Sequence, residues 1–428
     1  MNLLLRKILL ILVFGMLLVP HIQEQFGVVS IEPLQGGFMP AADTSFSIKG
    51  WFTGKYQSKK EKYLNENFGF RKTAVRLNNQ IDFSFFAKTN VSKFIIGKQG
   101  CIYAKEHLDA YTGKDFIGED SITHRMQRLK FVQDTLIKMG KTFIFVFAPG
   151  KASFYPEYFP EGYSDAMVEK NNYRVYLKQA KELGVAFIDF NKYFIDNKSK
   201  SKYPLYPLKF GIHWSDYAAC LAMDSLVKYI ENDRALDLPD FYWKKTEITF
   251  ARNIDIDIVP PMNLLYFSSE DKMAYPRLMI QSGQGKERPR IMAISDSFYA
   301  TLHNKGFTKA FSRNHFWYYN KSLVDIKLTR NIPLEEEIRN SDVILIMSTE
   351  ANLKDVSWGF IDDAYNLYAK GAKPYYDATL PMINYIKTDA AWIKSIQEKA
   401  DAKGISMDSM LYLDVKWMLD EEAKKQQR

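Results

Sequence analysis

The stretch Arg290-Ile291-Met292-Ala293-Ile294-Ser295-Asp296-Ser297-Phe298 predicts a buried strand that runs directly into a short polar turn. Its consecutive apolar residues are typical of a strand inside a sheet, and Phe298 to Leu302 is able to open a helix. A serine on such a strand-to-helix turn presents its hydroxyl at the carboxyl end of the strand, which suits a nucleophile such as Ser297. The same Ser-Asp-Ser turn is also a common helix N-cap, so the motif by itself leaves both interpretations open.

Alternating helix and strand patterns on both sides of this stretch predict an α/β fold. The further predicted elements are a helix over 121–139, a strand over 142–148, a helix over about 165–183, a strand over 185–190 and a strand over 342–347. This order favours a mainly parallel sheet with helices on both faces. Ligands of such sheets gather at the carboxyl ends of the strands, and Lys151 follows the strand at 142–148.

The N-terminal residues have the composition of an export signal. Arg6 and Lys7 precede an uncharged apolar run of 13 residues, Ile8 to Pro20, which is short for a spanning helix of about 20 residues. No cleavage site with small residues follows, so we predict that residues 1–26 are an uncleaved signal anchor, with a cleaved signal peptide as the alternative. Both interpretations export the rest of the chain, because the basic residues stay on the cytoplasmic side.

The predicted domain organisation has four segments. They are the anchor at 1–26, a linker and N-terminal helical arm at 27–90, the α/β domain at 91–370 and a helical C-terminal extension at 371–428. The linker is rich in Pro and Gly, and the arm is broken at Phe68-Gly69-Phe70-Arg71. The α/β domain opens with two apolar runs around Gly97-Lys98-Gln99-Gly100, which predict a hairpin. In the extension, Gly404 breaks a helix and Ser406 starts another.

Charge and cysteine usage exclude several classes of function. Lys and Arg outnumber Asp and Glu by 58 to 50, but the basic residues are scattered and no nucleic-acid motif occurs. We therefore expect no nucleic-acid partner and interpret the charge as a solvated surface, with a weak attraction to acidic polymers or lipid headgroups still open. Cys101 and Cys220 have no Cys or His at ligand spacing, so no metal site is predicted. We interpret them as separate buried thiols rather than as a disulfide.

His213 is the best-placed general base in a chain with only six histidines. It lies in Lys209-Phe210-Gly211-Ile212-His213-Trp214-Ser215-Asp216, just before a helix predicted from Asp216 to about Glu231 with Ser215 as its cap. A serine hydroxyl needs such a base within hydrogen-bond reach to act as a nucleophile. A packed, hydrogen-bonded histidine beside a tryptophan is the alternative, and the local sequence taken alone favours it.

An aromatic run follows the serine, at Phe311-Ser312-Arg313-Asn314-His315-Phe316-Trp317-Tyr318-Tyr319-Asn320. Its rings, Tyr318 among them, suit the lining of a carbohydrate-binding cleft. The same run suits core packing equally well, and the sequence leaves the two interpretations open.

Several short blocks, in their order along the chain, resemble the exported, SGNH-hydrolase-like alginate O-acetyltransferase family. They are Trp51-Phe-Thr-Gly-Lys-Tyr with Asn67-Phe-Gly-Phe-Arg71, Ile96-Gly97-Lys98-Gln99-Gly100, Ala148-Pro149-Gly150-Lys151 with Tyr155-Pro156-Glu157, His213-Trp214-Ser215, and Ile294-Ser295-Asp296-Ser297-Phe298. The histidine block precedes the serine block, which is the permuted order of this family and the reverse of ordinary SGNH esterases. The resemblance covers roughly residues 45–370 and implies an SGNH-hydrolase-like, mainly parallel sheet with circularly permuted motifs.

By this resemblance, Ser297 is the nucleophile and His213 is the base that takes its proton. The main-chain N–H of Ser297 would hold the oxyanion together with a second donor. The candidates for that donor or for contacts with the substrate are Lys151, a main-chain amide near Gly150, Trp214 and Tyr318.

Two positions depart from the pattern of the family. Ser295 stands where the family usually has Gly, a mild change at a turn. Gly211 stands where the family has the Asp that orients the imidazole, so His213 lacks its expected partner. Asp216, Asp296 or a main-chain carbonyl are the candidate replacements, and the remaining alternative is a site that no longer catalyses and only binds polysaccharide.

The resemblance implies an O-acetyltransferase that moves an acetyl group through an acetyl-serine onto hydroxyls of an exported polysaccharide, without a cofactor. In such systems a membrane-bound O-acyltransferase supplies the acetyl group across the membrane. We therefore expect this chain on the periplasmic side of the inner membrane, held by its N-terminal anchor. The alternatives are an acetyl esterase of the same fold and a non-catalytic carbohydrate-binding or scaffold subunit of a polysaccharide secretion complex. Sequence does not separate transfer from hydrolysis, because both use the same serine and histidine.

Overall fold

The computed structural model of the chain describes residues 3–36, 40–163, 168–281, 283–323 and 332–369. Between 382 and 421 it describes residues 382, 383, 386, 389–403, 405, 407, 410, 411, 413–415, 417, 418 and 421. The predicted helix break at Gly404 and the helix start at Ser406 lie outside the described residues. Helix α16 (Ala390–Lys403) falls in the predicted C-terminal extension.

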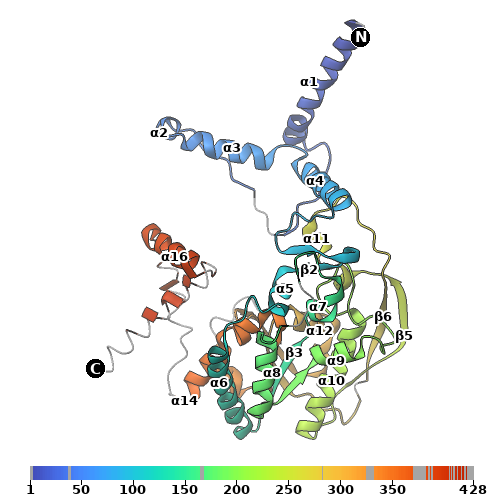
Figure 1. Cartoon of the computed structure of the whole chain (residues 1–428), viewed down its shortest axis with the longest axis vertical. Coiled ribbons are helices and arrows are strands. Elements are labelled where there is room, and N and C mark those ends of the chain that lie inside the picture. The colour runs from blue at the N-terminus through green and yellow to red at the C-terminus, as the bar shows by residue number, and fades with distance from the viewer. Residues whose placement is uncertain are drawn as a thin grey trace.

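A mainly parallel sheet forms the centre of the molecule (Figure 1). Its strand order within the described residues is β4 (Phe187–Asp189), β3 (Thr142–Ala148), β10 (Val343–Thr349), β7 (Arg290–Ser295), β8 (Arg313–Tyr318) and β9 (Ser322–Leu323). All neighbouring strands are parallel except β8 and β9. The α/β sheet that the sequence predicted is confirmed, and the carboxyl ends of β3, β10 and β7 meet at one edge of it.

Successive residues of the central strands face two separate hydrophobic clusters. On β3, Ile144 and Val146 belong to one cluster, whereas Phe143 and Phe145 belong to the other. Because both faces of the sheet are covered, its strands are apolar throughout and do not alternate with polar residues. The first cluster is closed by α9 (Phe190–Asn197), α10 (Asp216–Arg234) and α12 (Ser297–Lys305), and the second by α6 (Glu119–Lys138), α8 (Asn172–Glu182) and α14 (Phe360–Ala369).

Two smaller predictions are also confirmed. The hairpin consists of β1 (Phe94–Ile96) and β2 (Ile102–Ala104), which pair antiparallel. Cys101 and Cys220 are both buried and free. The remaining short helices are α5 (Lys105–Tyr111), α7 (Lys151–Phe154), α11 (Val259–Met262) and α13 (Leu334–Arg339), with 3-10 turns at Lys98–Gly100, Pro156–Tyr158, Asn253–Ile256, Phe307–Ala310 and Glu350–Gly359.

Two elements differ from the sequence predictions. The helix expected from about residue 165 begins at Asn172, because the side chain of Asn171 caps it by accepting the N–H of Arg174 at 2.9 Å. An antiparallel ribbon of β5 (Asp240–Phe250) and β6 (Lys272–Gln281) was not predicted and stands apart from the main sheet. The segment that joins its two strands returns to the end of the sheet, where it contributes to the site below.

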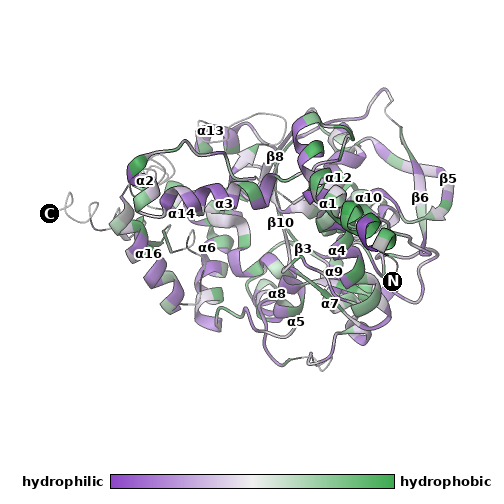
Figure 2. Cartoon of the chain, turned by 90° about the horizontal axis from the view of Figure 1, so that it is seen from above, coloured by the Kyte–Doolittle hydropathy of each residue, from purple (hydrophilic) through white to green (hydrophobic). Residues whose placement is uncertain are grey.

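The N-terminal residues project from the α/β domain (Figure 1). Helix α1 (Leu3–Phe26) extends past the apolar run and is the one helix of the described chain that is long and apolar enough to cross a membrane. Figure 2 shows its hydrophobic residues gathered along the helix. Three helices follow, α2 (Ile48–Phe52), α3 (Lys55–Asn67) and α4 (Arg71–Phe86), and α4 lies between α1 and the α/β domain.

Candidate active site

Asp296 follows β7 and fixes the turn that begins α12. One of its carboxylate oxygens accepts the main-chain N–H of Phe298 at 3.0 Å, which caps the helix. The other oxygen accepts the N–H and the hydroxyl of Thr349, at 2.9 and 3.0 Å, and the side-chain amide of Asn352 at 2.8 Å. The buried carboxylate therefore joins the end of β7 to the end of β10. This joint determines where Ser297, the first residue of α12, presents its hydroxyl.

His213 reaches Ser297 from the loop that precedes α10. Its Nε2 atom lies 2.7 Å from the Oγ of Ser297. Its ring packs against Phe298 with the ring centroids 4.7 Å apart, and its side chain is only 10% exposed. The loop is held in place because the hydroxyl of Tyr206 donates to the carbonyl of Ile212 at 2.9 Å. The structure thus brings together the two residues that the sequence proposed as nucleophile and base.

Asp257 is the acid that contacts His213. One of its carboxylate oxygens hydrogen-bonds the Nδ1 of His213, and the other accepts the main-chain N–H of Ile212 at 3.1 Å. A proton held on Nδ1 by this carboxylate leaves Nε2 free to accept the proton of Ser297. Sequence reasoning missed Asp257, because it lies between the unpredicted strands β5 and β6 and no spacing distinguishes it from the other acids of the chain.

Gly211 explains why the acid comes from another segment. A Cβ atom on Gly211 would lie 2.3 Å from the Cγ of Pro207 and 3.0 Å from the main-chain oxygen of Asp255. No side chain fits at this position, so an aspartate here would displace the segment that carries Asp257. The segment after β5 therefore occupies the space beside residue 211 and supplies the carboxylate itself.

The two acids that the sequence offered as replacements have other partners. Asp216 forms an ion pair with Lys305, with a distance of 2.5 Å between the carboxylate oxygen and Nζ. Asp296 has both oxygens engaged in the turn before Ser297. Asp257, rather than either of these residues, lies against the imidazole of His213.

Trp214 and Lys151 are both buried and have structural contacts. The indole N–H of Trp214 donates to Thr301 at 2.5 Å, and its ring packs among the aromatic side chains of the core. The Nζ of Lys151 donates to the carbonyls of Gly211, at 2.7 Å, and Lys209, at 3.2 Å. Burial lowers the pKa of Lys151 below its usual value. Lys151 therefore braces the backbone of the histidine loop.

Part of the aromatic run after Ser297 lies in the hydrophobic core, and part of it lies near the candidate active site. Phe316 and Trp317 of β8 are buried, whereas Tyr318 and Tyr319 are half-buried at the carboxyl end of the strand. Burial raises the pKa of the Tyr319 phenol above its usual value, and the main-chain N–H of Tyr319 donates to the carbonyl of Ser295 at 2.8 Å, two residues before Ser297. The phenol thus keeps its proton at neutral pH, and the main-chain hydrogen bond holds Tyr319 close to the turn that carries Ser297. Tyr319 is a second site residue that the sequence reasoning did not single out.

Tyr319 is held in an uncommon backbone conformation. Tyr319 and Asn320 have positive φ angles of 50° and 51°, and Ser357 and Trp358 have angles of 60° and 49°. The two turns contact one another, because the Asn320 amide donates to the Trp358 carbonyl at 3.1 Å and the Tyr319 and Trp358 rings pack edge to face. Strained backbone of this kind persists where the surroundings fix it, and it is frequent at functional sites.

A buried carboxyl lies under the same edge of the sheet. Glu350, directly after β10, accepts hydrogen bonds from the hydroxyl of Ser153, at 2.5 Å, and from the side-chain amide of Asn191. A Cβ atom on Gly150 would lie 2.3 Å from its Oε2 atom, which accounts for the glycine before Lys151. Burial raises the pKa of Glu350 to about 7, against the opposing hydrogen bonds from Ser153 and Asn191. Among the described residues, no group of His, Cys, Asp and Glu side chains is arranged to hold a metal ion.

We expect Glu350 to make folding stability depend on pH. Its pKa of about 7 in the folded chain exceeds the ordinary value of 4.5, so the folded state binds more protons between these values. The contribution of the protonated carboxyl to the free energy of unfolding is complete below about pH 4.5 and is lost as the pH rises through about 7. Urea unfolding at pH 5 and pH 8 should show that Glu350→Gln removes this loss, whereas the exposed control Glu335→Gln does not. An equal pH dependence in wild type and Glu350→Gln would refute the assignment.

We expect Asp257→Asn to lower the reactivity of Ser297 by on the order of 10⁴-fold, because an amide favours the wrong imidazole tautomer. The measurement is the rate at which a fluorophosphonate probe modifies Ser297. Asp216→Asn is the matched control, since Asp216 pairs with Lys305 and not with His213. Equal rates for wild type and Asp257→Asn would exclude Asp257 as the partner of His213.

We expect Gly211→Ala to lower both the melting temperature and the labelling rate of Ser297, because a Cβ atom has no room there. Gly283→Ala is the control, since no atom lies within 4 Å of the position that a Cβ atom would take on Gly283. Adding Gly211→Asp to the Asp257→Asn variant should not restore labelling. Restored labelling would show that an acid at residue 211 is able to replace Asp257.

One protein-family model and several solved structures are similar to this chain. The model of the SGNH hydrolase-like domain of the acetyltransferase AlgX matches residues 95–251. A similar solved structure is the O-acetyltransferase domain of Pseudomonas putida AlgJ, with 15% sequence identity and a TM-score of 0.43 over 64% of this chain and 99% of that chain. Pseudomonas aeruginosa AlgX has 13% identity and a TM-score of 0.42 over 67% of this chain and 70% of that chain. Bacillus cereus PatB1 has 13% identity and a TM-score of 0.41 over 62% of this chain and 99% of that chain. No curated protein sequence matches the chain. The match to the family model confirms the resemblance predicted from the blocks: over residues 95–251, this chain is similar to the SGNH hydrolase-like domain of the acetyltransferase AlgX.

Proposed function

We propose that this chain is an exported polysaccharide O-acetyltransferase with Ser297 as nucleophile, His213 as general base and Asp257 as the acid that orients the imidazole. The observation that carries the proposal is the continuous line of contacts from Asp257 through His213 to the Oγ of Ser297. The acetyltransferase family model that matches residues 95–251 supports acetyl as the transferred group.

The first half-reaction loads the enzyme. His213 Nε2 takes the proton of the Ser297 hydroxyl while Oγ attacks the carbonyl carbon of an acetyl donor. A tetrahedral oxyanion forms and collapses, the bond from the acetyl carbon to the leaving group breaks, and the leaving group takes the proton from His213. The product is an ester between the acetyl group and Ser297. The imidazolium that exists during this step is stabilised by the carboxylate of Asp257.

The second half-reaction delivers the acetyl group to a sugar. His213 takes the proton of a polysaccharide hydroxyl, whose oxygen attacks the acetyl carbon. The bond to Ser297 Oγ breaks, and the proton returns from His213 to the serine. Because water attacks the same ester in an esterase, the relative access of sugar and water to acetyl-Ser297 decides between transfer and hydrolysis.

Two donors are proposed to hold the oxyanion. The main-chain N–H of Ser297 opens α12, where helix N–H groups lack partners within the helix and favour negative charge. The hydroxyl of Tyr319 is proposed as the second donor, because Tyr319 follows β8 beside the end of β7. Lys151 is less suitable, because its Nζ is engaged by the carbonyls of Gly211 and Lys209. The main-chain N–H of Gly150 is likewise engaged, by the side-chain oxygen of Asn191 at 3.3 Å.

The donor, acceptor and location belong to the same proposal. Helix α1 anchors the chain in the inner membrane with the α/β domain on the periplasmic side. The length of the helix, its apolar composition and the basic residues in its first turns support this orientation. A membrane-bound O-acyltransferase supplies the acetyl group from across the membrane, and Tyr318 and Tyr319 contact the acceptor polysaccharide. The alternative of a non-catalytic binding subunit rested on Gly211, and it loses that support because Asp257 supplies the missing carboxylate contact.

We expect the full-length protein in nanodiscs to release acetyl from p-nitrophenyl acetate, and Ser297→Ala and His213→Ala to lose roughly 10³-fold or more of that rate. Mass spectrometry of the peptide that contains Ser297 should detect the acetyl-serine in wild type. Ser312→Ala is the control, since Ser312 is an exposed serine in the same part of the sequence. Adding soluble oligosaccharides tests transfer, because acetylated sugar at the expense of acetate indicates a transferase. If Ser297→Ala is as active as wild type, the proposed nucleophile is wrong.

A further inference from the structure

We propose that α2 and α3 form a second membrane attachment, an arm that lies on the surface of a bilayer containing anionic lipids, beside the point where α1 leaves it. The arm here is residues 46–67, the part of the N-terminal helical segment that contains α2 and α3. This inference rests on α1 as a spanning helix and does not depend on the acetyl transfer proposed above. It assigns a role to the first of the sequence blocks, which takes no part in the candidate active site.

Gly69, two residues after the arm, determines the position along α1 at which the arm meets that helix. A Cβ atom on this buried glycine would lie 1.9 Å from the main-chain oxygen of Pro20 and 2.8 Å from the main-chain nitrogen of Glu24. Pro20 ends the apolar run of α1, and three of the next four residues, His21, Gln23 and Glu24, are polar. The close contact therefore joins the arm to α1 at the level where the helix passes from hydrocarbon to lipid headgroups.

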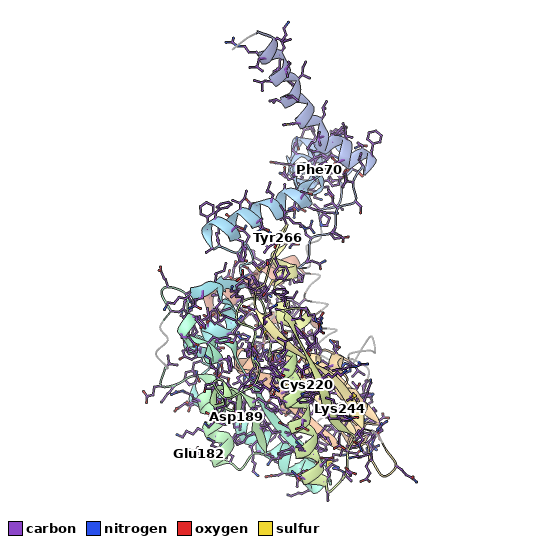
Figure 3. The ribbon with its side chains drawn as sticks, turned by 90° about the vertical axis from the view of Figure 1, so that its right-hand side faces the viewer. Phe70, Glu182, Asp189, Cys220, Lys244 and Tyr266 are labelled. Carbon is purple, nitrogen blue, oxygen red and sulfur yellow. The ribbon has the colours of Figure 1, made fainter. Side chains whose placement is uncertain are left out.

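The direction of the arm matches a membrane surface. Figure 1 shows α2 and α3 running sideways from the inner end of α1, across its axis, while the α/β domain lies beyond them. Figure 3 places Phe70, which follows the arm, beside the same end of α1. A helix that crosses the axis of a spanning helix at this level lies parallel to the membrane plane. No residue of α2 or α3 is buried against the rest of the chain.

An exposed apolar group occupies the far end of the arm. This aromatic tip consists of Phe46, Ile48, Trp51, Phe52 and Tyr56. The side chains of Phe52 and Ile48 are 84% and 71% exposed, and the rings of Phe46, Trp51 and Tyr56 pack together with centroids 5.2 to 6.1 Å apart. Amphipathic rings such as those of Trp and Tyr prefer the boundary between hydrocarbon and water, so a membrane surface would cover the tip.

The positive charge of the arm favours a surface of anionic lipids over an uncharged one. Five lysines lie between residues 46 and 67, against two glutamates. Lys60 pairs with Asp43 at 2.8 Å, and the other four, Lys49, Lys55, Lys59 and Lys62, are exposed. Lysines beside an apolar tip attract anionic headgroups, and that attraction weakens with salt. A hydrophobic pocket of a partner protein would match the tip but not lysines spread along the whole arm, and the arm is continuous with the proposed anchor. These features favour lipid as the partner.

The experiment uses the full-length protein in nanodiscs of phosphatidylethanolamine and phosphatidylglycerol with a nitroxide on part of the headgroups. The fluorophore NBD is attached at Phe52→Cys and, as the matched control, at Lys244→Cys, an exposed residue of β5 at the far end of the molecule (Figure 3). The native cysteines are buried, so unmodified protein is the labelling blank. Circular dichroism verifies that each variant is folded, and Ile48→Cys serves as a second labelling position.

We expect the headgroup nitroxide to remove most of the fluorescence at residue 52 and to leave that at residue 244 unchanged. Changing Lys49, Lys55, Lys59 and Lys62 together to Gln, replacing phosphatidylglycerol by phosphatidylcholine, or adding salt should each reduce the quenching. Unquenched fluorescence at residues 52 and 48 would overturn the proposal. It would also be overturned if these positions were shielded from a soluble quencher only in the presence of a co-reconstituted membrane acyltransferase, since the partner would then be a protein. None of these results depends on acetyl turnover, so failure of the proposed function is distinguishable.

Discussion

The carboxylate of Asp296 holds together the two central strands at the point where both end. Three of its hydrogen bonds reach Thr349, the last residue of β10, and Asn352 just after it, and one caps α12. A buried carboxylate without such partners is costly, so the four hydrogen bonds keep the turn in one conformation. The position of Ser297 follows directly, because it is the next residue. The line of contacts to His213 and Asp257 depends on that position, since a displaced serine would leave the imidazole without a proton to accept.

The histidine loop depends on a second constraint, the absence of a side chain at Gly211. The main chain of Asp255 packs where a Cβ atom would stand, and this packing carries Asp257 to the imidazole. Lys151 stabilises the same loop, because its Nζ donates a hydrogen bond to the Gly211 carbonyl. The residue that departs from the family's pattern is thus the one that admits the replacement acid. A missing motif residue does not by itself remove a catalytic group, because another segment is able to occupy the same place in space.

The N-terminal helices would determine where the proposed acetyl transfer takes place. Helix α1 and the arm meet at Gly69, and α4 connects them to the α/β domain. If the arm lies on the membrane surface, the chain has two attachments, and the distance of the domain from the bilayer is restricted more than by a single flexible anchor. Such a restriction matters for an enzyme whose acetyl donor is proposed to be a membrane protein and whose acceptor is a polymer.

Periodicity and local chemistry determined the central strands of this protein and the helices that begin beside the site. The apolar runs predicted β3, β7 and β10, the block around Ser297 predicted a strand that turns into a helix, and Ser215 before Asp216 predicted the start of α10. These features depend on neighbours in the chain, which is why the sequence alone was sufficient. The pairing of Ser297 with His213 was proposed from their residue types and from the order of the blocks.

The tertiary structure decided the rest: that Asp257 contacts the imidazole, that Asp216 and Asp296 do not, and that Tyr319 lies beside the serine while Trp214 is buried. These outcomes arise from contacts between residues that are far apart in the chain. His213 and Asp257, for example, are separated by 44 residues, and no local sequence pattern encodes a contact over that distance.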